Sequence, residues 1–215
     1  MMLYKKMFQF VDNYLSQSNV PILPFRKRSD HIKRVFMWSQ RLIPKEYSIN
    51  KEALLIAAIF HDVGYATCSN FVDHAENGAV ICQDYLKSHN YDEDMIAFIV
   101  YLVRNHSNKD LMTNKDTPLE LILLMEADLL DETGALSITW DCMSEGSQEV
   151  QSFEKTHAHI MKYSYKDVHS NPMITELGKN FWEKKQTLTS MFIEQLSFDL
   201  GIDTYSAPNS SFIDL

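Results

Sequence analysis

Residues 53–60 form an unbroken apolar run that ends directly in the dipeptide His61-Asp62. Asn50 before the run is a typical helix cap, and Gly64 after it predicts a left-handed turn that ends the helix. A helix that is apolar all round has to be buried, so two ionisable side chains lie at its buried end. They are costly there unless a partner compensates them, and a divalent metal ion binds both imidazole and carboxylate.

The composition of the 215-residue chain favours helices. Gly and Pro number only six each, against the many turns of an all-β sandwich, and no segment alternates with a convincing period of two. Hydrophobic residues make up 45% of the chain, which is enough for a sizeable core. We therefore predict one all-α domain over residues 1–215, a bundle of about eight helices. These cover about residues 2–17, 30–43, 51–62, 73–86, 92–106, 119–131, 147–165 and 172–200, and the helices from about 147 to 200 pack on the others or form a subdomain.

The charge and the cysteines exclude several classes of protein. The net charge is −9, from 20 basic and 29 acidic residues, so we expect neither nucleic acid nor a membrane as partner. No apolar run approaches the roughly 20 residues of a membrane helix. The three cysteines contain no Cys-x-x-Cys pair, which favours reduced thiols and a cytoplasmic protein.

Two further residues share the character of His61-Asp62. Asp128 lies in the otherwise apolar helical stretch 121–130, where a carboxylate is expected to be paired or metal-bound, a capping or salt-bridging role being the alternative. His31 stands near the start of a predicted helix. Together these residues predict a metal site.

Four segments, in this order, resemble the HD-domain superfamily of metal-dependent phosphohydrolases, in particular the small bacterial HD hydrolases. The resemblance covers about residues 25–140 and implies a single HD-type all-α domain. The segments are Asp30-His31-Ile32-Lys33-Arg34-Val35, His61-Asp62-Val63-Gly64-Tyr65, His74-Ala75-Glu76-Asn77-Gly78-Ala79 and Ala127-Asp128-Leu129-Leu130-Asp131-Glu132-Thr133-Gly134-Ala135.

The resemblance also implies a site. It assigns the metal to His31, His61, Asp62 and Asp128, with Asp62 and His61 as the catalytic pair that orients a metal-activated water. Mn, Fe, Ni or Zn suits two imidazoles and two carboxylates. His74 and His106 fall where binuclear members place extra ligands, so one or two ions are expected. The alternatives are that His74 caps a helix, and that His106 ends one or meets the substrate phosphate.

A substrate phosphate needs cations, and Lys33, Arg34 and Arg104 are the predicted ones. Arg34 follows His31 by about one turn and shares its helix face, whereas Arg104 closely precedes His106. Each has the alternative of pairing with an acidic residue. The basic cluster of residues 26–28 contacts a nucleotide or only solvates its loop.

The predicted function is hydrolysis of a phosphate ester or anhydride by metal-activated water, on a small phosphorylated substrate that we expect to be a nucleotide. One enzyme alternative is a cyclic-nucleotide or cyclic-dinucleotide phosphodiesterase. His74 and His106 favour it, although the Gly-Tyr-Pro extension of the cyclic-dinucleotide enzymes is missing after His106. Another is oxidative chemistry at a di-iron centre. A binding or signalling module without catalysis is the non-enzyme alternative, but all six ligands are present. The sequence does not decide whether the protein forms a homodimer.

Overall fold

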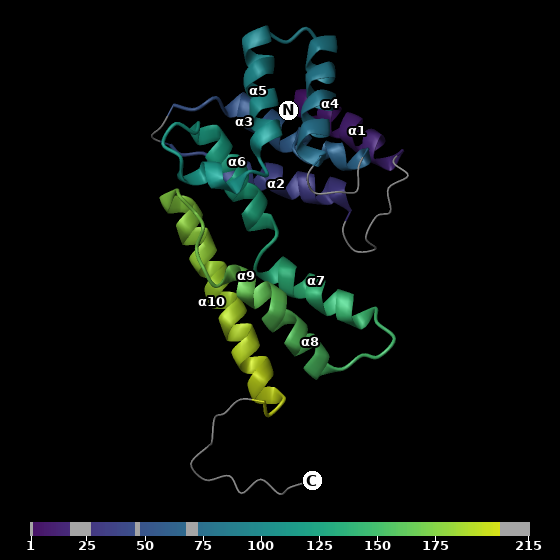
Figure 1. Ribbon diagram of the computed structural model, residues 1–215, viewed down its shortest axis with the longest axis vertical. Helices are drawn as coiled ribbons and strands as arrows, with labels where there is room; N and C mark the ends of the chain where they lie inside the picture. The colour runs from purple at the N-terminus through teal and green to yellow at the C-terminus, as the bar shows by residue number, and fades with distance from the viewer. Residues whose placement is uncertain (1, 18–26, 46–47, 68–72, 203–215) are drawn as a thin grey trace, which may run out of the picture. The chain divides into compact units, whose positions relative to one another are not determined.

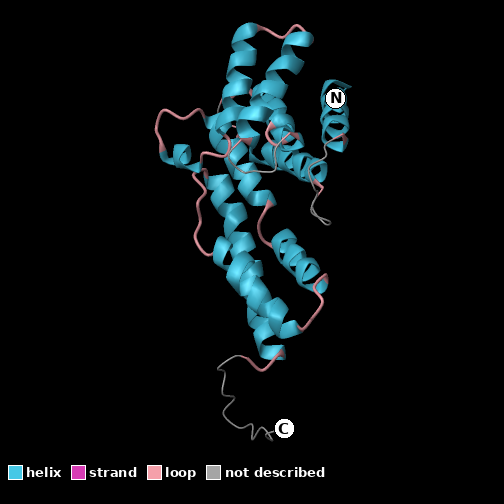
Figure 2. Ribbon diagram, turned by 45° about the vertical axis from the view of Figure 1, so that its right-hand side comes forward, coloured by secondary structure: helices cyan, strands magenta, loops and turns pink. Residues whose placement is uncertain are grey.

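The computed structural model describes residues 2–17, 27–45, 48–67 and 73–202. Within these ranges the chain forms helices and no strand, which confirms the all-α class (Figures 1 and 2). In the same ranges no helix is long and apolar enough to cross a membrane. The α-helices are α1 Met2–Ser16, α2 Arg28–Leu42, α3 Lys51–Phe60, α4 His74–Ser88, α5 Glu93–Asn105, α6 Leu119–Asp131, α7 Ala135–Gly146, α8 Phe153–Ile160, α9 Lys166–Val168 and α10 Glu176–Asp199.

The chain divides into two compact units. Unit 1 comprises Met1–Glu132 and Pro172–Phe181, and unit 2 comprises Thr133–Asn171 and Trp182–Leu215. The start of α10 therefore counts with unit 1 and the remainder of that helix with unit 2. The expectation of a single domain stays a prediction.

Helix α3 forms the centre of unit 1. Its residues 53–60 are all buried, and it contacts α1, α2, α5 and α6. Full burial of Leu54, Ile56 and Phe60 contributes roughly 1.5–3 kcal/mol per side chain. The Asn50 cap is confirmed, since its Oδ1 accepts a hydrogen bond of 3.0 Å from the Ala53 amide. The apolar run is thus the core element that holds His61-Asp62 in place.

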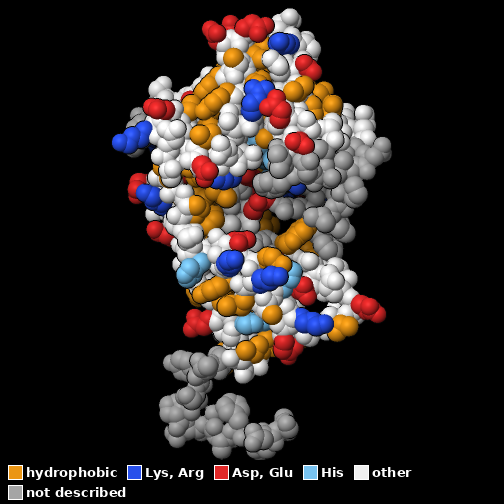
Figure 3. Space-filling model, in the orientation of Figure 1, with side chains coloured by type: hydrophobic (Ala, Val, Ile, Leu, Met, Phe, Trp, Pro, Cys, Tyr) orange, Lys and Arg blue, Asp and Glu red, His pale blue; other side chains and the backbone are white. Residues whose placement is uncertain are grey.

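Helices α4 and α5 form a hairpin that packs side by side in unit 1 (Figures 1 and 2). Exposed acidic side chains cover the tip that joins them (Figure 3), where Asp92, Glu93 and Asp94 stand at the start of α5. The carboxylate of Asp92 accepts from the amides of Asp94 and Met95 at 3.0 and 3.2 Å. Negative charge at a helix N-terminus is favourable, so this tip stabilises α5.

Gly64 does not form the predicted left-handed turn. In the described residues the positive-φ glycines are Gly134 and Gly201, whereas Gly64 lies in the 3₁₀ helix η1, Val63–Ala66. A Cβ on Gly64 would overlap the carbonyl of His74 and come within 2.5 Å of the Gly78 nitrogen. Glycine is needed here because η1 and α4 meet backbone to backbone, which brings His74 towards His61-Asp62.

A buried carboxylate on α6 anchors the segment before α10 within unit 1. Glu126 accepts from the amides of Ile174 and Thr175 at 2.6 and 2.7 Å, and from the Thr175 hydroxyl at 2.6 Å. Burial raises the pKa of Glu126, although these hydrogen bonds favour its charged form. The Phe181 ring also packs edge-on against Trp38, with centroids 5.2 Å apart. Residues 172–181 are thereby fixed to the helices that carry the candidate site.

In unit 2 the predicted helix over 147–165 is wrong in its bounds. Helix α7 begins at Ala135, directly after Gly134 with its φ of 73°, and α8 begins only at Phe153, where the Ser152 hydroxyl accepts from the Lys155 amide. The left-handed conformation at Gly134 allows a new helix to start at once after the preceding turn. The core of this unit includes Ile138, Ile160 and Ile193.

Candidate metal centre

The structure brings the six predicted ligands together within unit 1. His61 and Asp62 follow α3, His74 begins α4, and His106 follows α5. The other two stand on neighbouring helices, His31 on α2 and Asp128 on α6. All are buried except Asp128, whose side chain is 17% exposed. Residues 97 positions apart in sequence thus converge on one place.

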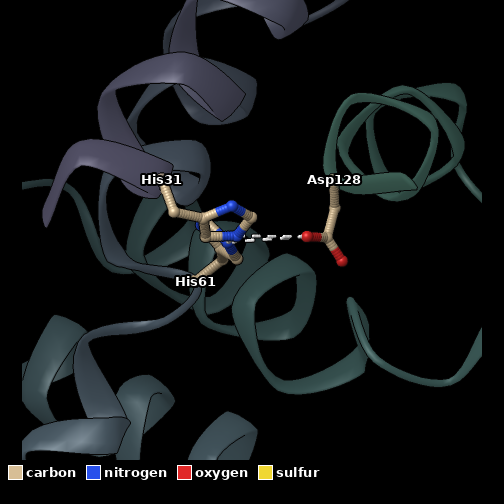
Figure 4. A group of neighbouring side chains, drawn as sticks. All are labelled: His31, His61 and Asp128. Carbon is tan, nitrogen blue, oxygen red and sulfur yellow. Dashed lines mark hydrogen bonds and ion pairs between the residues drawn. The ribbon is translucent and has the colours of Figure 1, made fainter. Parts of the chain in front are cut away.

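The first half of the site is formed by His31, His61 and Asp128 (Figure 4). The Nε2 atoms of the two histidines are 3.2 Å apart. Asp128 Oδ1 lies 3.3 Å from Nε2 of His31 and 4.0 Å from Nε2 of His61. Asp62 Oδ2 lies 3.3 and 3.6 Å from the same two nitrogens. Each of the two carboxylates therefore has one oxygen within 4.0 Å of both Nε2 atoms.

The second half is formed by His74 and His106. Their Nε2 atoms are also 3.2 Å apart, and both face the other oxygen of Asp62, Oδ1, at 3.5 and 3.6 Å. The two carboxylate oxygens of Asp62 thus face two separate pairs of imidazoles. His61, Asp62 and His106 alone also meet the spacing of a metal site.

The orientation of the imidazoles fits a metal. Nδ1 of His61 lies 2.8 Å from the carbonyl of Ala58, and Nδ1 of His106 lies 2.7 Å from the carbonyl of Val103. A carbonyl only accepts, so both Nδ1 atoms carry the proton and both Nε2 atoms present a lone pair. Both lone pairs face the buried carboxylate of Asp62 at 3.6 Å, which is repulsive, whereas a cation between them is attractive. The orientation of His61 and His106 therefore fits a bound metal ion.

His31 is oriented by Asp131, which the sequence analysis did not single out. His31 Nδ1 is 2.7 Å from Asp131 Oδ2, and Asp131 accepts two further hydrogen bonds from Arg34, at 2.8 and 3.0 Å. A carboxylate behind a ligating histidine fixes its ring and raises its basicity. The available signal was spacing, because Asp131 follows Asp128 by three residues and so shares its helix face.

The protonation states of His61 and of the two carboxylates suit metal binding, whereas His31 has to release a proton when a metal binds. Burial lowers the pKa of His61 to about 4, which keeps this ring neutral near pH 7. Burial also lowers the pKa of His31, but hydrogen bonds to Asp128, Asp131 and Asp62 outweigh it and raise that pKa to about 10. Burial would raise the pKa of Asp62 and Asp128, but the neighbouring histidines with Arg28 hold the pKa of Asp62 well below the usual range, and Lys109 with His31 does the same for Asp128. Two ionised carboxylates, one buried and one largely buried, call for positive charge.

The three predicted phosphate cations are held in other ion pairs. Lys33 lies 3.4 Å from Asp12 on α1. Arg104 forms two hydrogen bonds with Glu76, at 2.6 and 3.0 Å, on an exposed part of α4 and α5.

Arg34 is the one next to the site, through Asp131. Its contact is with the carboxylate that orients His31. Lys33, Arg34 and Arg104 thus each form a salt bridge with an acidic residue, which was the alternative to phosphate binding.

Two other basic residues contact the centre instead. Arg28 Nη1 lies 2.6 Å from Asp62 Oδ2, and Lys109 Nζ lies 2.8 Å from Asp128 Oδ2. Arg28 belongs to the basic cluster noted in the sequence, whereas Lys109 carried no signal beyond its place three residues after His106. The guanidinium of Arg28 lies over the Tyr65 ring at 4.1 Å, and that ring stacks on His74 at 4.3 Å.

Comparisons with known proteins identify the domain and its fold. Residues 28–133 match the HD domain family. The chain therefore contains an HD domain and belongs to the HD-domain superfamily, as the four segments predicted. No curated protein sequence matches the chain.

Solved structures share the fold at low sequence identity. An HD-superfamily hydrolase from Bacillus thuringiensis is 21% identical with a TM-score of 0.69, and the match covers 93% of this chain and 97% of that one. A predicted HD-superfamily hydrolase from an uncultured Thermotogales bacterium is 20% identical with a TM-score of 0.65, covering 92% of each chain. YpgQ of Bacillus subtilis, crystallised in complex with ADP, is 16% identical with a TM-score of 0.64, covering 91% of this chain and 93% of that one.

Proposed function

We propose that this protein is a metal-dependent phosphohydrolase that cleaves a phosphate ester or anhydride of a nucleotide. The proposal rests on one observation, the placement of four buried imidazoles around Asp62. The Nε2 atoms of His31 and His61 face one of its oxygens, and those of His74 and His106 face the other. Such a donor set suits Mn, Fe, Ni or Zn. When bound there, a divalent ion would activate a water molecule and neutralise charge on a phosphoryl oxygen.

Each side chain of the site has a defined task in this proposal. His31, His61, Asp62 and Asp128 would hold one ion, and Asp62 with His74 and His106 would hold a second. The hydrogen bonds at Nδ1 keep the rings from turning, so that Nε2 remains the donor. Asp62 stands between both halves and orients the water that attacks phosphorus.

A nucleotide is supported by one comparison. YpgQ of Bacillus subtilis has the same fold and has been crystallised with ADP. A phosphodiesterase is the second candidate, because the His74–His106 pair provides the second ion position that the binuclear phosphodiesterases use. Both candidates require the same metal centre and differ in the substrate.

The test is a phosphate-release screen on protein that has been freed of metal and reloaded with Mn, Ni, Zn or Fe(II). Nucleoside mono-, di- and triphosphates and cyclic nucleotides serve as substrates. We expect release from at least one nucleotide with reloaded wild type and none with Asp62→Ala, whose far-UV circular dichroism remains helical. A reloaded wild type that hydrolyses none of these compounds contradicts the proposal.

A further inference from the structure

Besides their contacts with histidines, Asp62 and Asp128 are each paired with one arginine or lysine. Arg28 Nη1 lies 2.6 Å from Asp62 Oδ2, and Lys109 Nζ lies 2.8 Å from Asp128 Oδ2. In the described part of the chain, no other lysine or arginine forms an ion pair with either carboxylate. These two cations therefore stand at opposite carboxylates of the same site.

The cations are more exposed than the acids they contact. The side chain of Arg28 is 26% exposed against 5% for Asp62, and that of Lys109 is 32% exposed against 17% for Asp128. Each thus reaches from solvent inward, and can contact an anion that enters the site. The Tyr65 ring, 4.1 Å from the guanidinium of Arg28, keeps that group in place, and Lys109 is held by a hydrogen bond to the His106 carbonyl at 3.0 Å.

The charge balance changes when the carboxylates serve as metal ligands. A divalent ion held by His31, His61, Asp62 and Asp128 would be neutralised by the two carboxylates, because imidazole binds metal as a neutral ligand. The positive charges of Arg28 and Lys109 are then left without a counter-ion. A second ion at His74 and His106 would add to this excess.

Two uncompensated cations call for an anion with two charges. A terminal phosphate or phosphate monoester has close to two negative charges at pH 7, because its second pKa is about 6. A phosphodiester has one. Arginine suits phosphate because its guanidinium donates two parallel hydrogen bonds, and lysine acts as a point charge.

We propose that Arg28 and Lys109 form a phosphate-binding pair, which selects a terminal, doubly charged phosphate at the metal centre. The pair neutralises Asp62 and Asp128 in the metal-free protein and turns to the substrate when metal takes the carboxylates. This inference rests on the proposed hydrolase function, and it favours a terminal phosphate over a cyclic or other diester.

The test separates phosphate binding from metal binding. Arg28→Met and Lys109→Met are compared with Arg41→Met and Lys115→Met, which remove an exposed cation from the end of α2 and from the segment after η2, Lys109–Thr113. Titration calorimetry measures binding of Mn²⁺ to metal-free protein, and then of inorganic phosphate to the loaded protein. Loss of one charge-assisted hydrogen bond weakens phosphate binding about 10- to 100-fold.

We expect that loss in Arg28→Met and Lys109→Met, with Mn²⁺ affinity equal to or higher than that of wild type, since a competing cation is gone. Arg28→Lys should recover part of the phosphate affinity. Both controls should behave like wild type. Unchanged phosphate affinity in both test variants, or a parallel loss of Mn²⁺ affinity, overturns the proposal, because the cations would then serve only to hold the carboxylates.

A pair of substrates tests the charge selection. Wild type should hydrolyse p-nitrophenyl phosphate with a higher kcat/KM than bis(p-nitrophenyl) phosphate, and the two test variants should lose more on the first than on the second. Equal losses on both overturn the selection. If wild type hydrolyses neither compound nor any nucleotide, the proposed function fails, whereas the phosphate titration still decides the role of Arg28 and Lys109.

Discussion

Asp131 offers the sharpest single perturbation of the metal centre. Its buried carboxylate accepts hydrogen bonds from His31 Nδ1 at 2.7 Å and from Arg34 at 2.8 and 3.0 Å. In Asp131→Asn the amide oxygen can still accept from His31, but the NH₂ group faces Arg34 in place of the second oxygen. At least one charge-assisted hydrogen bond is lost, which is worth about 1.5–3 kcal/mol of unfolding free energy. The weaker hold on the His31 ring should reduce metal affinity about 10- to 100-fold.

The assay is calorimetric titration of metal-free protein with Mn²⁺, beside urea unfolding followed by circular dichroism. The matched control is Asp141→Asn, which alters another buried carboxylate, in unit 2, that accepts from Ser164 and pairs with His159. The control should lose stability and keep its Mn²⁺ affinity. If Asp131→Asn binds Mn²⁺ as tightly as wild type, Asp131 does not orient the His31 ligand and our reasoning is refuted.

Asp131→Asn should also change how the unfolding free energy depends on pH. Burial would raise the pKa of Asp131, but the hydrogen bonds from His31 and Arg34 hold it below its ordinary value of 3.8. A carboxylate with a lowered folded-state pKa stabilises the fold fully above its unfolded pKa, and this contribution disappears as the pH falls through the folded value. Wild type should therefore lose more unfolding free energy than Asp131→Asn between about pH 5 and pH 2.

Three further predictions test the surroundings of the centre. Gly64→Ala should abolish metal binding or prevent folding, because its Cβ overlaps the His74 carbonyl. Protein yield and Mn²⁺ binding are compared with those of the control Gly146→Ala, where a Cβ meets nothing within 4 Å. His74→Ala should reduce the bound metal measured by elemental analysis from two ions to one while the other half of the site remains loaded; an unchanged ratio would show that His74 is no ligand. Glu126→Ala should lower the unfolding free energy by about 2–4 kcal/mol in urea unfolding, because it leaves two amides without their acceptor, and a change below 0.5 kcal/mol would contradict that anchoring role.

Much of the fold was predictable because its signals are local. The apolar run, the Asn50 cap and the periodicity of the first six helices each depend on neighbours in sequence. Helix α7 was missed because its Ser, Thr and Gly residues interrupt the apolar pattern, and because Gly134 can either end a helix or precede one. The prediction of a left-handed turn at Gly64 was wrong. Glycine is needed there because its backbone lies close to α4, and this approach is visible only in three dimensions.

The sequence predicted which six side chains come together at the candidate site, but not which side chains contact them. His61, Asp62 and Asp128 were marked as ionisable groups in apolar helical stretches, and all four ligands, His31 included, by the family resemblance. Which cation meets which carboxylate depends on the packing of distant helices. Arg34 reaches a partner 97 residues away, and Arg28 one that is 34 residues away.

The most direct test of the account is a joint measurement of bound metal and phosphate release in one preparation. Metal-free protein is reloaded in steps with Mn²⁺, the ion is counted per chain, and nucleotide hydrolysis is followed at each step. We predict that metal-free protein is inactive, that activity rises with bound metal up to two ions per chain, and that Asp62→Ala neither binds the ions nor releases phosphate. Hydrolysis that persists without metal, or a fully loaded wild type that releases no phosphate from any nucleotide, would contradict the account.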